Sequence, residues 1–214
     1  MICRRGEIFE KYYRLLAEWN QKFNLTAITE RDEVFVKHFA DSLLGEEFVG
    51  ENASVLDVGT GAGFPSLPIK IVRDDISLTL VDSLQKRINF LNCVLSELDI
   101  KKAEALHARA EDLSCRETFD CAVSRAVAPL STLCEYCLPF VKTGGVFIAY
   151  KAENCEEEVA SSLKAAEILG GGRAEIFKRR LDENTERSFV IIRKVRPTPA
   201  AYPRGKNLPR KSPL

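Results

Sequence analysis

The sequence VLDVGTGAGFP, from Val55 to Pro65, combines a short apolar run, an aspartate and three closely spaced glycines. A short apolar run that ends at turn residues is typical of a buried strand. Glycine adopts backbone conformations that other residues avoid, and it lets the chain approach a ligand closely. The stretch therefore predicts a strand followed by a tight ligand-binding loop.

Three kinds of ligand compete for this loop. A P-loop for nucleoside phosphates ends in glycine, lysine and serine or threonine, and this loop has no such ending. A dinucleotide fingerprint has glycine at its sixth position, where this chain has Phe64, so that match is partial. S-adenosylmethionine carries an amino acid and an adenosine without a pyrophosphate, and the loop suits it. Asp57 is expected near the ammonium group, and the glycines would turn beneath the methionine portion; they are Gly59, Gly61 and Gly63.

Acidic residues follow the next two predicted strands. Asp82 comes about 20 residues after the glycines, where a carboxylate can accept hydrogen bonds from both ribose hydroxyls. The sequence RAED, residues 109–112, follows the third strand, and in a methyltransferase arrangement Glu111 and nearby backbone would border the adenine. Helix capping is the alternative role for Glu111 and Asp112. Together the loop and these acids favour S-adenosylmethionine over a dinucleotide.

The chain alternates strands and helices from residue 53 onward. Residues 6–20 and 31–48 place apolar side chains at helical spacing, which predicts a helical extension over residues 1–50. Helical segments between the strands imply right-handed crossovers and a parallel, doubly wound α/β sheet of Rossmann-like type over 51–196. A hairpin at its end adds an antiparallel edge strand. The expected strands are 54–58, 77–82, 103–108, 119–126 and 144–151, and the hairpin segments are 174–181 and 187–195.

The composition indicates one sizeable domain. The chain has 214 residues, of which 45% are hydrophobic and 29% are charged. It has no apolar run long enough to span a bilayer, and its amino terminus lacks the features of a signal peptide. We therefore expect a cytoplasmic protein without a membrane partner, acting as a monomer.

The cysteines indicate a reducing compartment and no metal site. There are seven, an odd number with irregular spacing, which does not suit a disulfide framework. Cys134 and Cys137 form the only CxxC pair, and a zinc site would need two further ligands from the distant His38 and His107. Two small buried thiols on one helical turn are the better interpretation.

The charge is unevenly distributed although the formal net charge is zero. Seven of the 31 lysines and arginines lie between Arg193 and Leu214, where there is no acid, which leaves 24 bases against 31 acids elsewhere. Phosphate binding responds to local potential, so the basic, proline-rich tail at 197–214 predicts contact with RNA, with a merely solvated tail as the alternative. The tail should be irregular and ordered only where it docks. The residues expected to track phosphates are Arg4, Arg5, 178–180, Arg204, Lys206, Arg210 and Lys211.

Several segments resemble one bacterial family, in order and over nearly the whole chain. They are LLAEWNQKFNLTAIT, HFADSL, DVGTGAGFPSLPIKI, RAEDL, FDCAVSRAVAPL and YPRGKNLPRKSPL. Among them, WNQKFNLTAI and SRAVAPL are the most distinctive. The chain is similar to the RsmG family, also called glucose-inhibited division protein B, whose members methylate guanine N7 in 16S ribosomal RNA.

The resemblance implies a class I methyltransferase fold, S-adenosyl-L-methionine as cofactor, and 16S rRNA or the small ribosomal subunit as partner. The sequence departs from the family pattern at Ser66 and Ala152, where the family commonly has glycine. The cofactor contacts of the family fall on Gly59, Phe64, Ala110, Glu111 and Arg125.

The segment after the fourth strand, VSRAVAP, is expected to face the methyl acceptor. It lacks the (D/N)PP(Y/F) loop of adenine amino-group methyltransferases and the cysteine that methylates carbon 5 of pyrimidines. Ribose methylation often uses a lysine and an acid, and Lys151 with Asp41 leaves that option open. Guanine N7 carries a lone pair and no proton, so a site without a general base suits it.

Two residues are candidates for the catalytic step. Arg125 is expected where cofactor and acceptor meet, with a structural pairing to Glu111 or Asp112 as the alternative. Lys151 ends the fifth strand and is either a contact to phosphate or base, or a surface lysine. A packed, hydrogen-bonded role is the expectation for His38. Phe64 either lines the cofactor pocket or fills the core.

Four functions are open from the sequence. An RNA guanine-N7 methyltransferase is favoured. A methyltransferase for a small molecule or a protein is the alternative, against which the basic tail argues. A non-catalytic nucleotide- or RNA-binding protein and a dinucleotide oxidoreductase are weaker options.

Overall fold

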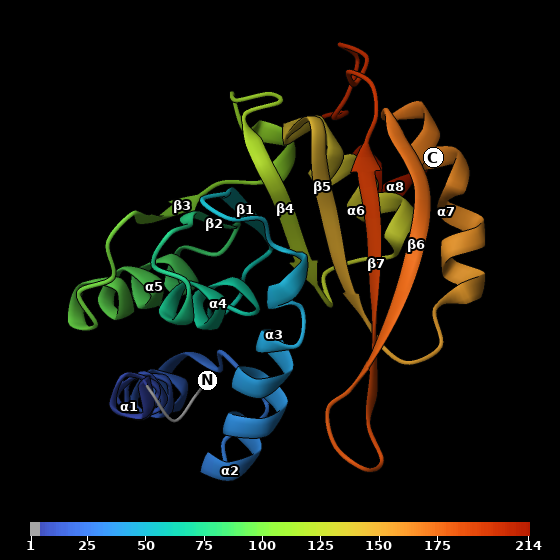
Figure 1. Ribbon diagram of the computed structural model, residues 1–214. Helices are drawn as coiled ribbons and strands as arrows, with labels where there is room; N and C mark the ends of the chain where they lie inside the picture. Colours follow the sequence, from blue (N-terminus) through green and yellow to red (C-terminus); the bar gives the residue numbers. More distant parts are fainter. Residues whose placement is uncertain (1–4) are drawn as a thin grey trace.

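A seven-stranded sheet forms the centre of the computed structural model, which describes residues 5–214 (Figure 1). The strand order is β3-β2-β1-β4-β5-β7-β6. The strands are β1 (Ser54–Val58), β2 (Ser77–Asp82), β3 (Ala103–His107), β4 (Phe119–Arg125), β5 (Val141–Lys151), β6 (Gly171–Arg180) and β7 (Glu186–Lys194).

Helices precede the sheet and connect its strands. The α-helices are α1 (Gly6–Phe23), α2 (Arg31–Val34), α3 (Asp41–Leu43), α4 (Ser66–Val72), α5 (Gln85–Glu97), α6 (Leu130–Cys137), α7 (Glu156–Ile168) and α8 (Leu208–Lys211). A π-helix, η2 (Phe35–Ala40), joins α2 to α3, and the 3-10 turns are η3 (Glu46–Phe48), η4 (Ala110–Asp112) and η5 (Leu138–Phe140).

The observed pairing confirms the doubly wound sheet. Strands β1 to β5 pair with one another in parallel. Strand β7 runs antiparallel to both β5 and β6. The predicted hairpin is therefore present, and β6 forms the outermost strand. Strand β5 begins at Val141, before the expected start, because Val141 already pairs with Phe119 ahead of an irregularity in the register.

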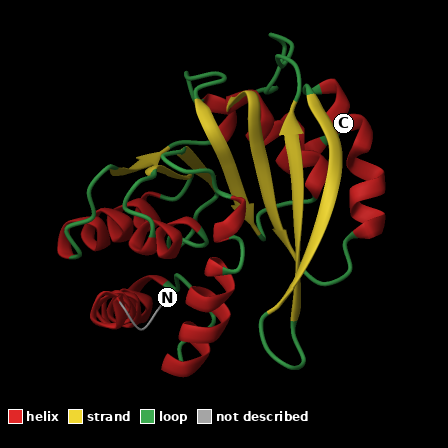
Figure 2. Cartoon of the chain, viewed as in Figure 1, coloured by secondary structure: helices red, strands yellow, loops and turns green. Residues whose placement is uncertain are grey.

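Two helical layers cover the sheet, as Figure 2 shows. Alternate residues of a strand point to opposite faces, so Val55 packs with α1, α4 and α5 while Leu56 packs with α6 and α7. Both faces of the central strands are buried, which explains why β1 is apolar almost throughout.

The amino-terminal extension packs beneath the loop that follows β1. Its first helix, α1, buries Phe9, Tyr12 and Leu16. Tyr12 lies in an aromatic cluster with Phe39 and Phe64, and its hydroxyl donates a hydrogen bond to the Ala62 carbonyl oxygen at 2.5 Å. Burial raises the pKa of Tyr12 well above its ordinary value, so the hydroxyl remains a donor. The extension thereby contacts the glycine loop directly.

The carboxyl-terminal tail folds back onto α6. Thr132 donates a hydrogen bond to the Pro209 carbonyl oxygen at 3.1 Å, and Arg204 forms an ion pair with Glu135 at 2.6 Å. The tail is irregular up to Asn207, as expected, but the short helix α8 was not expected from its prolines. None of the helices in the described part of the chain combines the length and apolar character needed to cross a bilayer.

We predict that Tyr12→Phe lowers the free energy of unfolding by about 1–2 kcal/mol, because it leaves the buried Ala62 carbonyl oxygen without its donor. Urea denaturation measures this change. The matched control is Tyr13→Phe, whose exposed hydroxyl lies 3.4 Å from the Thr29 carbonyl oxygen and should change stability by less than about 0.5 kcal/mol. Equal stabilities of the two variants would contradict a contribution of the Tyr12 hydroxyl.

Candidate active site

A cavity of about 760 Å³ opens at the carboxyl ends of β1, β2, β4 and β5. Doubly wound sheets bind ligands at this edge, where the strand order reverses between β1 and β4. A volume in the range of roughly 300–1,000 Å³ is typical of pockets for small molecules. The position and size therefore make this cavity the candidate active site.

Two glycines of the loop are required for different reasons. Gly59 has a φ of 71°, and a Cβ atom there would lie 2.5 Å from a Val127 methyl carbon. Gly63 has a φ of 98°, and a Cβ atom there would lie 2.5 Å from the Tyr12 hydroxyl. Gly59 and Gly61 line the cavity, whereas Gly63 lies outside the lining. Gly63 therefore serves the packing of α1, and its expected place beneath the ligand stays a prediction.

Asp82 joins the loop to the end of β2. One carboxylate oxygen accepts a hydrogen bond from the Leu84 amide at 2.9 Å, and the other accepts from the Gly61 amide and the Arg87 guanidinium, both at 3.0 Å. Asp82 also lines the cavity, as expected. A carboxylate offers about four acceptor positions, so one remains for a ribose hydroxyl, and that contact stays a prediction.

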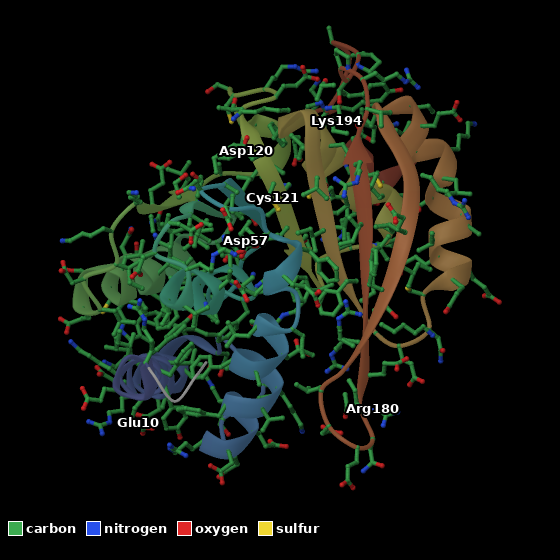
Figure 3. All side chains as sticks on the ribbon, viewed as in Figure 1. Glu10, Asp57, Asp120, Cys121, Arg180 and Lys194 are labelled. Atoms are coloured by element: carbon green, nitrogen blue, oxygen red, sulfur yellow. The ribbon has the colours of Figure 1, made fainter. Side chains whose placement is uncertain are left out.

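Asp57 lies beneath the loop and not in the cavity. It is fully buried, and Figure 3 shows it in the interior of the molecule. One oxygen accepts hydrogen bonds from the Thr60 hydroxyl at 3.1 Å and the Ser66 amide at 3.3 Å. The side chain is absent from the lining, and the expected contact with an ammonium group stays a prediction. Asp57 stabilises the bend between β1 and α4, and burial raises its pKa to about 7.

The turn after β3 borders the other end of the cavity. Ala110 and Glu111 both line it. The Glu111 carboxylate accepts a hydrogen bond from the Asn207 amide at 3.2 Å, so the carboxyl-terminal tail reaches this end. Their role in holding an adenine stays a prediction.

Arg125 belongs to an ion-pair network centred on Asp41. Its guanidinium donates a hydrogen bond to one Asp41 oxygen at 2.6 Å, and the Arg187 guanidinium donates to the other at 2.5 Å. This excludes the alternative in which Arg125 pairs with Glu111 or Asp112. Asp41 is only 2% exposed, so a buried carboxylate fixes two arginines that line the cavity.

The π-helix η2 brings the side chains of Lys37 and His38 to the cavity. π-Helical segments are rare and often occur at functional sites. The His38 ring stacks on Phe64 with centroids 4.5 Å apart, and its Nε2 atom lies 2.8 Å from the Thr26 hydroxyl, which confirms a packed, hydrogen-bonded histidine. Burial, together with the nearby charge of Arg125, lowers the pKa of His38 to about 4. The ring is therefore neutral at pH 7.

Phe64 combines both roles that were considered for it. The ring lies in the aromatic cluster with Tyr12 and Phe39 and also lines the cavity. The Arg125 guanidinium carbon lies 5.2 Å from the Phe64 ring centroid, within the range of a cation–π interaction. Phe64 thus connects the hydrophobic core with the charged end of the cavity.

Comparison with known proteins agrees with this geometry. The family described as rRNA small subunit methyltransferase G, GidB, matches residues 5–193. The chain belongs to this family. A relative named ribosomal RNA small subunit methyltransferase G from Desulforamulus reducens is 51% identical, with 96% of this chain and 89% of the relative covered. The relative of the same name from Clostridium botulinum strain 657 is 49% identical, with the same coverage.

A solved structure supports the fold. Protein Atu636 from Agrobacterium tumefaciens, described as a predicted O-methyltransferase, superposes with a TM-score of 0.60 at 18% identity. The match covers 74% of this chain and 82% of that protein. At this identity the likeness concerns the fold alone, and it confirms the expected class I methyltransferase architecture.

Two positions depart from the pattern expected for the GidB family. The Ser66 hydroxyl is buried and has no hydrogen-bond partner among the described residues, as is also true of the second Asp57 oxygen. Serine therefore adds an unsatisfied polar group beneath the loop. Ala152 lines the cavity next to Lys151.

Lys151 is held by partners and is not a free surface lysine. Its ammonium group donates hydrogen bonds to Glu158 at 2.7 Å and to the Ala128 carbonyl oxygen at 3.3 Å. The side chain is 11% exposed and lines the cavity. A contact from Lys151 to the acceptor stays a prediction.

Basic residues surround the cavity although the net charge is zero. The lining holds seven lysines and arginines against three carboxylates. Arg187 was missed from the sequence because its strand lies far along the chain from the other site residues. The seven bases are Lys37, Arg87, Arg109, Arg125, Lys151, Arg187 and Arg210.

Some basic residues near the ends of the chain form ion pairs within the protein, although all of them were expected to contact RNA phosphates. Arg204 is paired with the buried Glu135, so the structure gives it a role in docking the tail. Arg5 pairs with Asp74 at 2.7 Å. Arg4 lies outside the described residues. The exposed bases of the tail, whose contact with RNA stays a prediction, are Lys206, Arg210 and Lys211.

The basic segment 178–180 lies on the β6–β7 hairpin. Lys178 pairs with Glu156 at 3.1 Å, and Arg179 pairs with Glu47 at 2.7 Å. Figure 3 shows Arg180 toward the tip of the hairpin, and its side chain is not part of the cavity lining. Of this hairpin, Arg187 on β7 lines the cavity, whereas the three bases of 178–180 on β6 do not.

No cysteine of the described chain lines the cavity. Cys134 and Cys137 are buried on α6, as expected, and burial raises the pKa of Cys134 to about 12. Within residues 5–214, no group of three or more histidine, cysteine, aspartate and glutamate side chains is placed to hold a metal ion.

We predict that Asp57→Asn removes a pH dependence of stability. The carboxyl group has an ordinary pKa of 3.8 and a pKa of about 7 in the folded protein. Between these values the folded protein binds the proton more tightly than the unfolded chain, so the free energy of unfolding falls as pH rises. The difference corresponds to at most about 4 kcal/mol. His38, whose pKa is lowered to about 4, contributes an opposite slope below about pH 6.5 to both proteins. The free energy of unfolding of wild type minus that of Asp57→Asn, measured by urea denaturation between pH 5 and pH 8, should therefore fall as pH rises.

Asp120→Asn is the matched control. Partial burial raises the pKa of Asp120, but hydrogen bonds from Lys142 and Ser54 outweigh it and hold the value at about 2. That carboxylate stabilises the fold above its ordinary pKa of 3.8 and loses this effect only at lower pH. Asp120→Asn should therefore change stability equally at pH 5 and pH 8. A difference in stability between wild type and Asp57→Asn that does not change with pH would contradict the raised pKa of Asp57.

Proposed function

We propose that this protein transfers a methyl group from S-adenosyl-L-methionine to N7 of a guanine in small-subunit (16S) ribosomal RNA. One observation carries the proposal: relatives named ribosomal RNA small subunit methyltransferase G are about half identical along 96% of the chain. The family match over residues 5–193 includes both the extension and the sheet.

The cavity fits a cofactor with an amino acid at one end and an adenosine at the other. Gly59 and Gly61 would lie beneath the methionine portion, because no side chain separates their backbone from the cavity. Asp82 would accept hydrogen bonds from the ribose, and Ala110 with Glu111 would border the adenine. When bound, S-adenosylmethionine supplies an electrophilic methyl group.

The acceptor end of the cavity suits an atom that carries no proton. Asp41 is engaged by two arginines. The pKa of His38 is lowered to about 4, so its ring is a weak base at pH 7. No described cysteine lines the cavity, which argues against attack by a thiolate. Guanine N7 attacks through its own lone pair, and the enzyme then contributes alignment of the reactants.

The arginines held by Asp41 are suited to the acceptor nucleotide. A guanidinium offers a planar set of donors that matches phosphate oxygens and the acceptor edge of a guanine. Because Asp41 neutralises only one of its two partners, Arg125 and Arg187 keep a positive charge at the cavity. We assign Arg125 to orienting the acceptor and Lys151 to supporting the same end.

The proposal also covers the RNA surface and the assembly state. Bases around the cavity would bind backbone phosphates, which position an RNA without reading its sequence. The target guanine would be unstacked, since a base inside an RNA helix is poorly accessible. We also propose a monomer that acts in the cytoplasm, where ribosomal subunits are assembled.

We predict that methyl-labelled S-adenosylmethionine transfers label to 16S rRNA. Naked RNA and assembled small subunits are tested side by side, and nucleoside analysis identifies the product. The expected product is 7-methylguanosine from at least one substrate. Label in a different nucleoside would contradict the proposed acceptor atom. The absence of label from both substrates would contradict the proposed reaction.

Arg125→Ala tests the site in the same assay. Loss of a positioned donor should lower the rate of transfer by about 100-fold, while the affinity for S-adenosylhomocysteine changes little. The matched control is Arg173→Ala, which removes an exposed arginine of β6 outside the cavity. Weakened cofactor binding in Arg125→Ala would contradict its assignment to the acceptor.

A further inference from the structure

The carboxyl-terminal tail is clamped to α6 by a buried carboxylate. The Glu135 side chain is only 1% exposed. It accepts hydrogen bonds from the Arg204 backbone amide at 2.8 Å and from the Arg204 guanidinium at 2.9 Å and 2.6 Å. A buried carboxylate without a partner is strongly unfavourable, so Glu135 favours the docked tail over a released one.

Beyond this clamp, the tail forms part of the cavity wall. Asn207 has a left-handed backbone with a φ of 59°, and its amide donates to Glu111 at 3.2 Å. The Tyr136 hydroxyl donates to the Asn207 side-chain oxygen at 3.1 Å. Asn207, Tyr136 and Arg210 all line the cavity at the end where Ala110 and Glu111 lie.

We propose that residues 204–210 complete the cofactor pocket, with Asn207 and Arg210 as pocket residues at the adenosine end and Glu135 as the positioning residue. The inference rests on the proposed function, because it identifies the ligand as an adenosine-containing sulfonium cofactor. Arg204 is engaged by Glu135 and is unsuited to RNA phosphates, whereas the exposed Lys206 and Lys211 face outward. The tail thus holds the cofactor with one set of residues and presents charge to solvent with another.

Coupling between tail and cofactor follows from this arrangement. If the docked tail contributes to the pocket, the cofactor binds the docked state more tightly than the released state. By thermodynamic linkage, the cofactor must then stabilise docking by the same factor. A tail that only adds stability to α6 would show no such reciprocity.

The experiment measures both directions of the coupling. Calorimetry gives the affinity of the full-length chain for S-adenosylhomocysteine. Limited trypsin digestion with mass spectrometry gives the cleavage rate in the tail, after Arg204, Lys206, Arg210 or Lys211. Cleavage after Arg180, an exposed hairpin residue outside the cavity lining, is the internal control.

We expect Glu135→Gln to weaken S-adenosylhomocysteine binding about tenfold, within the usual range of allosteric coupling, and to accelerate tail cleavage. In wild type, S-adenosylhomocysteine should slow cleavage of the tail and leave cleavage after Arg180 unchanged. Glu156→Gln, at an exposed carboxylate of α7, should match wild type in both measurements. Asn207→Gly keeps the left-handed backbone and removes only the side chain, so it should weaken binding about threefold even if Glu135→Gln fails to fold.

Two results would overturn the inference while leaving the proposed function intact. One is wild-type affinity for S-adenosylhomocysteine in Asn207→Gly and in any folded Glu135→Gln. The other is tail cleavage that S-adenosylhomocysteine does not slow. If wild type itself binds no S-adenosylhomocysteine, the proposed function fails first, and the inference fails with it.

Discussion

The bend between β1 and α4 is the constraint on which the rest of the structure depends. It is held from four directions: by backbone hydrogen bonds to Val81 of β2, by the Asp82 carboxylate, by the Tyr12 hydroxyl of α1 and by the buried Asp57. Because these groups come from the sheet and the extension, the bend forms only when both are folded. The extension is therefore part of the site, because the packing of α1 helps to fix the loop that lines the cavity.

Local charge decides what the cavity can bind. A chain with no net charge places seven bases and three carboxylates around one opening. Asp41 supports this arrangement because it is buried and shared, which fixes two guanidinium groups without neutralising both. The π-helix before it turns Asp41 and His38 toward the cavity. The lowered pKa of His38 and the engagement of Asp41 by two arginines agree with a reaction whose acceptor has no proton to lose.

The sequence predicted the sheet well, because strands buried on both faces and amphipathic helices leave clear patterns. Gly59, Asp82, Glu111 and Arg125 were also found, since each follows a strand whose carboxyl end meets the cavity. Other residues left no local signal. Arg187 lies on an antiparallel strand, and the partnership of Glu135 with the tail depends on long-range packing. The burial of Asp57 also left no local signal, because it depends on how the loop packs over β1.

The tail has two proposed roles. Arg210, whose charge suggested contact with RNA, also lines one end of the cavity. In the proposed function, the bend after β1 holds the amino-acid end of a sulfonium cofactor. A crystal structure of the protein with S-adenosylhomocysteine tests it most directly. We expect the amino-acid portion of S-adenosylhomocysteine to lie over Gly59 and Gly61 and its adenine to lie beside Ala110 and Glu111. A ligand bound elsewhere, or a preference for a pyrophosphate-containing dinucleotide at this bend, would contradict it.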